Sequence, residues 1–204
     1  MAENDHSSIF SRNVPGSTGA FQAATVGIAG CGGLGSNAAL SLVRAGIGRL
    51  ILADFDAVEE SNLNRQFYFQ TDIGQKKVHA LGRHLRAVNP EVRLTLADRK
   101  ITPQDVAPLF RDADLLIEAF DRAESKAWLI EAWVSAFPGR PIVCANGLSG
   151  IGNTESLAVR RAGNMYIVGD GETDPSIGLC AARVGIVANM EANMALDLLL
   201  GMKR

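Results

Sequence analysis

The residues with the clearest chemical meaning lie near the amino terminus, where an apolar segment runs into a glycine-rich loop. This loop, Gly-Cys-Gly-Gly-Leu-Gly, holds Gly30, Gly32, Gly33 and Gly35. Glycines permit a tight turn and a close approach of backbone amides to phosphate, and a helix that begins there directs free N–H groups at an anion. The pattern alone is a weak signal, because it arises by chance and serves many cofactors. It indicates a phosphate site only together with the residues that follow.

Carboxylate, amide and cationic side chains follow the loop. Asp54 ends the next apolar segment, where an acidic side chain accepts hydrogen bonds from ribose hydroxyls. Asn62, Arg65 and Lys77 come after it. Isolated basic residues usually belong to a solvated surface, but here they would neutralise β- and γ-phosphates and stabilise departing pyrophosphate. This set favours a nucleoside triphosphate over a dinucleotide, so a Rossmann dehydrogenase is the less favoured reading.

A further carboxylate, Asp121, comes just after the apolar run at residues 115–117. It has two interpretations: an N-cap of the following helix, or a ligand of Mg²⁺ at a nucleotide pocket. Capping would be favoured for an isolated aspartate. Beside the glycine loop, we favour the magnesium role.

Strand and helix patterns alternate along most of the chain. Apolar runs predict strands at residues 26–29, 50–52, 92–96, 115–117 and 142–144, and later antiparallel strands at 156–159 and 165–168. Helical spacing predicts helices around 38–43, from about 73 to 88, after Thr102, at 124–137, and at the end of the chain, where Gly201 would stop the helix. The alternation predicts an α/β, Rossmann-like fold with a mostly parallel sheet, helices on both faces, and a late antiparallel portion.

Length and composition fit one domain. We expect a polar N-terminal arm at residues 1–20 and a single ATP-binding domain at 21–204. The formal charge of −2 argues against a general binder of nucleic acid or anionic membranes. Because the N-terminus lacks a signal-peptide pattern and no run reaches membrane-spanning length, we expect a cytoplasmic protein with no membrane partner.

Together, the glycine loop, the Asp54-x-Asp56-x-Val58 pattern, the Ser61-Asn-Leu-x-Arg-Gln66 run, Gly74-Gln-x-Lys77 and Asp121 resemble the ThiF/MoeB/HesA family, which is related to the ubiquitin-activating enzymes. The Ser61–Gln66 run is the most specific part of the resemblance. The likeness extends from Arg12 to the last helix.

The resemblance implies ATP-dependent adenylylation of the C-terminal Gly-Gly carboxylate of a ubiquitin-fold sulfur carrier protein, with release of pyrophosphate, in thiamine biosynthesis. It implies that ATP and Mg²⁺ are bound, that Asp121 holds the metal, and that Arg12 reaches the ATP of a neighbouring subunit in a homodimer. The other implied ATP contacts are Gly30, Gly32, Gly33, Gly35, Asp54, Asp56, Asn62, Arg65, Gln66 and Lys77.

The cysteines depart from the family pattern. Many relatives carry two C-x-x-C pairs that bind structural zinc, whereas the three cysteines here lie far apart, so we predict no zinc. Cys180 lies near the position of a cysteine that some relatives use for thioester or persulfide chemistry. A small buried core residue is the favoured reading, and a covalent role is the alternative.

Other functions fit the same residues. One is adenylylation of another substrate, such as the small subunit of molybdopterin synthase or a tRNA threonylcarbamoyladenosine, although the near-neutral charge speaks mildly against tRNA. A non-catalytic adaptor for a ubiquitin-like protein is the non-enzymatic alternative. The candidate charged residues are all present, which argues against an adaptor.

Overall fold

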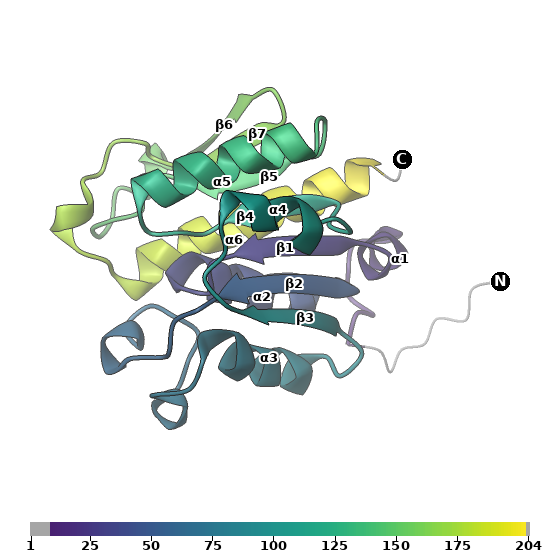
Figure 1. Ribbon diagram of the computed structural model, residues 1–204, viewed down its shortest axis with the longest axis horizontal. Coiled ribbons are helices and arrows are strands. Elements are labelled where there is room, and N and C mark those ends of the chain that lie inside the picture. The colour runs from purple at the N-terminus through teal and green to yellow at the C-terminus, as the bar shows by residue number, and fades with distance from the viewer. Residues whose placement is uncertain (1–8, 203–204) are drawn as a thin grey trace.

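A seven-stranded sheet runs through the middle of the molecule (Figure 1). The computed structural model describes residues 9–202, and within them the strands lie in the order β3-β2-β1-β4-β5-β7-β6. The strands are β1 (Thr25–Ala29), β2 (Arg49–Asp54), β3 (Arg93–Asp98), β4 (Leu115–Glu118), β5 (Ile142–Ala145), β6 (Ala158–Ala162) and β7 (Met165–Gly169).

Neighbouring strands of this sheet are parallel, except that β6 runs antiparallel to β7. The register pairs Ile28 of β1 with Leu52 of β2 on one side and with Ile117 of β4 on the other. Strand β6 lies at the edge, and all five of its residues are exposed. The predicted α/β fold with a late antiparallel pair is therefore confirmed.

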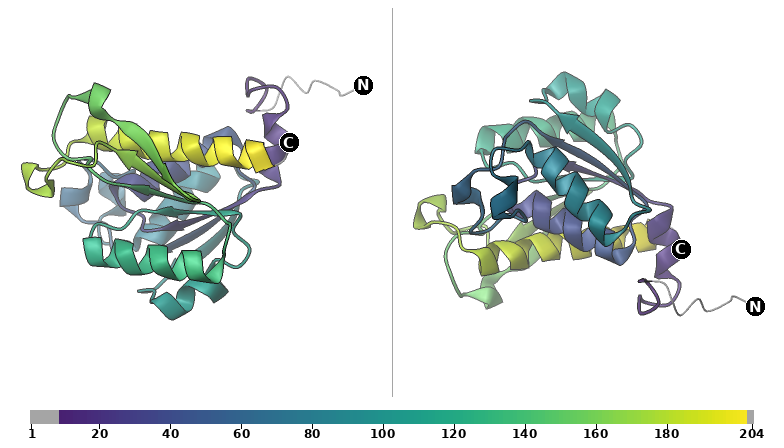
Figure 2. Two further views of the ribbon diagram at one scale, coloured as in Figure 1. Left: turned by 90° about the horizontal axis from the view of Figure 1, so that it is seen from above. Right: turned by 90° about the horizontal axis from the view of Figure 1, so that it is seen from below.

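Helices cover both faces of the sheet (Figure 2). Residues of α2, α3 and α6 belong to the core cluster on one face, and residues of α4 and α5 belong to the cluster on the other. The helices are α1 (Ser17–Gln22), α2 (Gly33–Ala45), α3 (Lys77–Val88), α4 (Pro103–Leu109), α5 (Ala123–Ala136) and α6 (Ala181–Met202). Short 3-10 turns occur at Glu60–Asn62, Gln70–Asp72, Thr154–Ser156 and Pro175–Ile177.

Strand β2 illustrates why the central strands read as continuous apolar runs. Successive side chains of a strand point to opposite faces, so Leu50 and Leu52 join the cluster beneath α2 and α3, whereas Ile51 joins the cluster that contains Trp133 of α5. Both faces are covered, and both must therefore be apolar.

Helix α3 begins at Lys77, not near residue 73 as expected. The backbone of the preceding residues is used elsewhere: Gly74 donates to the carbonyl of Val58, and Val58 donates to the carbonyl of Gln75. Gly74 also has a φ of 83°, which lies outside the helical region. The sequence pattern could not reveal this pairing between distant segments.

Part of the expected N-terminal arm is helical. Helix α1 starts at Ser17, with Ser17 and Phe21 buried, and the side-chain amide of Asn13 donates to the carbonyl of Ala45 at 2.9 Å. The first eight residues lie outside the described part of the chain. The division into an arm and one domain stays a prediction.

Helix α6 differs from expectation in two respects. Gly201 lies inside the helix, which runs to Met202, and does not stop it. The helix is also long and apolar enough, by length and composition only, to cross a membrane, contrary to the expectation that no run reaches that length. Core helices of soluble proteins pass the same test of length and composition.

Candidate functional site

The glycine loop joins β1 to α2 in a turn that admits little beyond glycine. Gly30 has a φ of 99°, and a Cβ there would lie 2.6 Å from the carbonyl oxygen of Ala119. A Cβ on Gly35 would lie 1.9 Å from the carbonyl oxygen of Gly30. These glycines allow the first turn of α2 to pack tightly against the loop. No side chain from residues 9–202 caps this helix end, so its first amides stay available to an anion.

Asp54 holds the loop from the end of β2. Its carboxylate accepts hydrogen bonds from the backbone amides of Cys31, at 2.6 Å, and Asp56, at 2.8 Å. Burial raises the pKa of Asp54, and the amide bonds oppose that shift only in part. Asp54 thus fixes the turn of the glycine loop.

Lys77 is a buried cation at the start of α3, with only 8% of its side chain exposed. Its Nζ lies 3.0 Å from Oδ2 of Asp56, and its backbone amide donates to the carbonyl of Asp56. The hydroxyl of Tyr68 bonds the carbonyls of Cys31 and Lys77, at 2.8 and 3.4 Å, and links the loop to α3. The position of Lys77 is therefore set by the loop and by Asp56.

These residues share one pocket of about 430 Å³ at the carboxyl ends of the parallel strands. Chain connectivity reverses direction between β1 and β4, and ligands of open α/β sheets bind at such a switch point. The predicted residues that line this pocket are Gly30, Gly32, Asp54, Asp56, Lys77 and Asp121. The pocket therefore brings the amide loop, a cation and carboxylates together.

Asp121 projects from the turn between β4 and α5. Arg122, not Asp121, takes the N-cap position of α5, so the capping interpretation is wrong. Asp121 is exposed, and it forms no hydrogen bond or ion pair with the described part of the chain. The turn itself is held by Glu118, whose carboxylate accepts from the amide of Phe120 at 2.7 Å and pairs with Nζ of Lys126 at 2.9 Å. Burial raises the pKa of Glu118.

The Ser61–Gln66 run lies beside the glycine loop rather than inside the pocket. A Cβ on Gly33 would lie 3.5 Å from Cγ of Arg65, and one on Gly32 would lie 3.9 Å from Nε2 of Gln66. The buried Oε1 of Gln66 has no hydrogen-bond partner among residues 9–202. Gln66 therefore has an unused polar atom next to the loop.

Two of the expected phosphate contacts have local partners. Oδ1 of Asn62 accepts the amide of Glu59 at 3.1 Å and closes a 3-10 turn, so the structure gives this residue a turn-forming role. Nη1 of Arg65 donates to the carbonyl of Ser61 and, at 2.7 Å, to Oδ1 of Asn64. The other guanidinium nitrogens of Arg65 have no hydrogen-bond partner among residues 9–202.

Several residues that line the pocket were not predicted from the sequence. Arg99 and Lys100 follow β3, and Nζ of Lys100 lies 5.9 Å from the ring centroid of Phe55. Trp128 of α5 also lines the pocket and packs against Phe120. The signal for the two cations was available, because any residue that follows a parallel strand lies at the ligand-binding edge.

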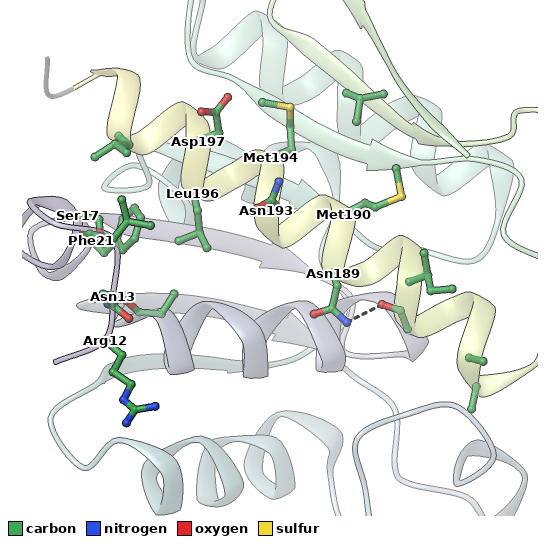
Figure 3. A pocket seen from close by; sticks show the side chains of 18 residues that line it. Arg12, Asn13, Ser17, Phe21, Asn189, Met190, Asn193, Met194, Leu196 and Asp197 are labelled. Carbon is green, nitrogen blue, oxygen red and sulfur yellow. Dashed lines mark hydrogen bonds between the residues drawn. The ribbon is translucent and has the colours of Figure 1, made fainter. Parts of the chain in front are cut away.

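Arg12 and Cys180 lie apart from this pocket. Arg12 is exposed at the edge of a second and larger groove, of about 1,140 Å³, which follows α6 (Figure 3). Cys180 is half-buried and immediately precedes α6, whereas Cys31 and Cys144 are buried. Burial raises the pKa of Cys31 and raises that of Cys144 to about 12, so neither has the setting of a reactive thiol.

The described residues contain no group of three or more histidine, cysteine, aspartate or glutamate side chains arranged to hold a metal ion. A magnesium ion does not need one, because it usually takes one or two protein carboxylates and the oxygens of substrate phosphates. The free carboxylate of Asp121 fits that donor set.

Curated proteins with related sequences match only part of this chain. The adenylyltransferase and sulfurtransferase MOCS3 of Bos taurus is 39% identical over 127 residues, which are 62% of this chain and 28% of that protein. The probable adenylyltransferase/sulfurtransferase MoeZ of Mycobacterium tuberculosis is 35% identical over 121 residues, 59% of this chain and 30% of that protein. The chain thus spans less than a third of the length of these relatives.

Solved structures share the fold over most of the chain. The tRNA N6-threonylcarbamoyladenosine dehydratase TcdA of E. coli superposes with a TM-score of 0.84 at 24% identity, covering 92% of this chain and 90% of that one. E. coli MccB with ATP gives 0.72 at 22% identity, covering 90% of this chain and 57% of that one. A profile of the ThiF family matches residues 11–204. The chain therefore belongs to the ThiF family.

Proposed function

We propose that this protein is an adenylyltransferase that uses ATP to activate the carboxylate of a partner molecule. The observation that carries the proposal is one pocket lined by Gly30 and Gly32 of the glycine loop, the buried cation of Lys77 and the free carboxylate of Asp121, next to the uncapped start of α2. Membership of the ThiF family, and relatives named adenylyltransferases, support it.

In the proposed reaction, an oxygen of the substrate carboxylate attacks the α-phosphorus of ATP. The bond from that phosphorus to the oxygen bridging the α- and β-phosphates breaks, pyrophosphate leaves, and an acyl-adenylate remains. No general base is needed, because the nucleophile is already ionised. The protein contributes positioning and charge stabilisation: Asp54 orients the ribose, and Lys77 and Arg65 offset the charge on the departing pyrophosphate.

Asp121 would hold Mg²⁺ against the phosphates. When bound, the ion offsets their negative charge and polarises the phosphoryl oxygens. Phe55 and Lys100 flank the end of the pocket near β2 and β3, where the base would lie beyond the ribose on Asp54.

The proposed substrate is the C-terminal Gly-Gly carboxylate of a ubiquitin-fold sulfur carrier, and the proposed pathway is thiamine biosynthesis. The names of the curated relatives, which pair adenylyltransferase with sulfurtransferase, support a sulfur-carrier substrate. The resemblance described above supports the thiamine pathway.

The test is carrier-dependent exchange between ATP and labelled pyrophosphate, together with mass spectrometry of the carrier. With a thiamine-pathway carrier and Mg-ATP, we expect exchange and a carrier mass increased by one AMP. If only a molybdopterin-synthase small subunit supports exchange, that protein is the substrate and the proposed thiamine pathway is wrong. ATP binding without exchange for any carrier, or for a threonylcarbamoyladenosine-bearing tRNA, would favour the adaptor.

We also propose that two copies associate through the groove along α6. Its lining includes the apolar side chains of Ile186 and Met190, which lie at the surface of α6. Arg12 lies at its edge and not among the residues that line the nucleotide pocket of its own chain, and its guanidinium points away from α6 (Figure 3). A second copy on this face would cover the apolar surface. In such a dimer, we propose that Arg12 of each copy acts at the nucleotide pocket of the other copy.

A further inference from the structure

A buried ion pair lies at the base of the segment that precedes α6. We call residues 171–180 the pre-helix segment. Asp170 and Arg183 flank it, their side chains are 5% and 4% exposed, and Nη2 of Arg183 lies 2.5 Å from Oδ2 of Asp170. Asp170 also accepts the backbone amides of Glu172 and Thr173, both at 2.9 Å. The pair therefore closes the pre-helix segment into a loop with fixed ends.

Arg183 also joins this loop to the segment after β5. Its Nη1 donates to the carbonyls of Gly152 and Asn153. Among the described residues, Asn153 is the only one other than glycine with a positive φ, at 49°. Residues hold such a conformation when their surroundings fix it. A Cβ on Gly147 would lie 1.9 Å from Oδ1 of Asp170, so the fit admits only glycine there.

The other end of the pre-helix segment contacts the Ser61–Gln66 run. Nδ2 of Asn64 donates to the carbonyl of Leu179 at 3.1 Å. This bond orients the side-chain amide, so that Oδ1 of Asn64 accepts Nη1 of Arg65 at 2.7 Å. Asn64 thus has one hydrogen bond to the pre-helix segment and one to the guanidinium.

The first turn of helix α6 also packs against the glycine loop. Val184 follows Arg183 directly, and its Cγ1 lies 2.9 Å from the place where a Cβ on Gly33 would be. The aliphatic part of Arg65 lies against the same glycine. The first turn of α6 and Arg65 therefore pack on one spot of the loop.

We propose that the Asp170–Arg183 pair positions Arg65 for the phosphates of ATP, through the carbonyl of Leu179 and the side chain of Asn64. The inference rests on the proposed function, which makes Arg65 a phosphate ligand. Asp170, Arg183 and Asn64 are positioning residues. Without them the guanidinium samples other rotamers, and the apparent affinity for ATP falls with the fraction of molecules whose Arg65 is correctly aimed.

The deciding variant is Asn64→Ala in the full chain. It removes both hydrogen bonds of the relay but leaves the buried ion pair intact. We measure Mg-ATP binding by calorimetry, and KM and kcat in pyrophosphate exchange. We expect the Kd and the KM for Mg-ATP to rise about tenfold, as for the loss of one hydrogen bond to a charged group. Unchanged Kd and KM would overturn the inference.

The ion pair is tested with Arg183→Met, Arg183→Lys and the double variant Asn64→Ala/Arg183→Met. A merely structural role would lower kcat with the folded fraction and leave KM unchanged, whereas positioning raises KM. We expect Arg183→Met to raise KM about as much as Asn64→Ala, the double variant to add nothing further, and Arg183→Lys to recover part of the loss. If the two substitutions raise KM additively in the double variant, Asn64 and Arg183 do not act through the same contacts and the inference is wrong.

Glu172→Gln is the matched control, because its side chain lies in the same segment and is exposed. It should keep the Kd and KM of the wild type. If Arg183→Met does not fold, Asn64→Ala decides alone. If the wild-type chain binds no Mg-ATP, the proposed function itself is wrong. If the wild type and Asn64→Ala both bind Mg-ATP normally, only the positioning inference is wrong.

Discussion

Among single residues, Lys77 has the setting that differs most from that of an ordinary lysine. Its side chain is buried, yet its partner Asp56 is about half exposed. A buried cation needs a counter-charge, because desolvation of an unpaired ammonium is costly. Asp56 supplies that charge and holds Nζ facing the pocket. A phosphate can approach the same nitrogen, so the pair keeps Lys77 in position for a ligand.

At the same scale, we predict that Asp121→Ala loses activity without losing stability. The side chain is exposed and unpaired within the described residues, so the free energy of unfolding should change by less than about 0.5 kcal/mol. Loss of the Mg²⁺ ligand should lower carrier-dependent pyrophosphate exchange about 100-fold or more. Glu124→Ala, an exposed carboxylate in the first turn of α5, should leave exchange unchanged. Normal pyrophosphate exchange in Asp121→Ala would show that Asp121 is not the Mg²⁺ ligand.

Helix α2 and the glycine loop act as one element, since the first helical turn lies directly on the carbonyl of Gly30. We predict that Gly35→Ala destabilises the protein by about 1–3 kcal/mol, because the new Cβ must push that backbone oxygen aside. It should also weaken Mg-ATP binding by displacing the amides. Urea denaturation and calorimetry measure the two effects.

The matched control is Gly19→Ala in α1, where no atom lies within 4 Å of the new Cβ. Alanine is the better helix former, so this variant should gain about 0.5–1 kcal/mol and bind Mg-ATP normally. Equal stability losses in the two variants would show that the contact with Gly30 is not the cause.

The Asp170–Arg183 pair that flanks the pre-helix segment makes a pH-dependent contribution to the free energy of unfolding. Burial opposes ionisation of Asp170, but hydrogen bonds from Thr173, the amide of Glu172 and Arg183 outweigh it and lower the pKa of Asp170. A depressed pKa in the folded state stabilises the protein above the unfolded pKa of about 3.9, and this contribution is lost as the pH falls through the folded pKa.

We therefore predict that Asp170→Asn lowers the free energy of unfolding by about 3 kcal/mol at pH 7. The difference from the wild type should narrow as the pH falls below about 4, where the wild-type carboxyl loses its advantage. Urea titrations between neutral and acidic pH measure it. A difference that stays constant with pH would mean that the charge of Asp170 contributes nothing.

Elements and site residues could be predicted where they depend only on the local sequence. Glycine spacing and the residues just after apolar strands identified Asp54 and Asp121, because parallel strands end at one edge. The late start of α3 was not predictable, since it depends on backbone pairing with Val58. Arg99 and Lys100 follow β3 and could have been found by the same rule, although how close they lie to Asp54 also depends on β3 being the neighbour of β2.

On the scale of the whole molecule, the proposed dimer can be tested by mixing two inactive variants. If Arg12 acts on the partner's ATP, a dimer of one Arg12→Ala chain and one Lys77→Met chain contains one intact site. Random exchange should then restore about a quarter of the wild-type activity, as expected for an interface with two-fold symmetry. The measurement is pyrophosphate exchange after the subunits have been mixed.

Each variant alone and an unmixed pool serve as controls, and sedimentation gives the oligomeric state. No recovery from verified mixed dimers would show that Arg12 serves its own chain or neither site. A monomer at all concentrations would remove the dimer proposal.

The edge of the sheet at β6 affects how the protein behaves at high concentration. An edge strand offers unpaired backbone groups to any other extended chain, which is a route to fibrils and precipitation. Here all five residues of that edge strand are exposed, and two of them, Arg160 and Arg161, are cationic. Their like charges repel an identical strand arriving in register, so the edge that ends the fold also helps to keep the molecules apart.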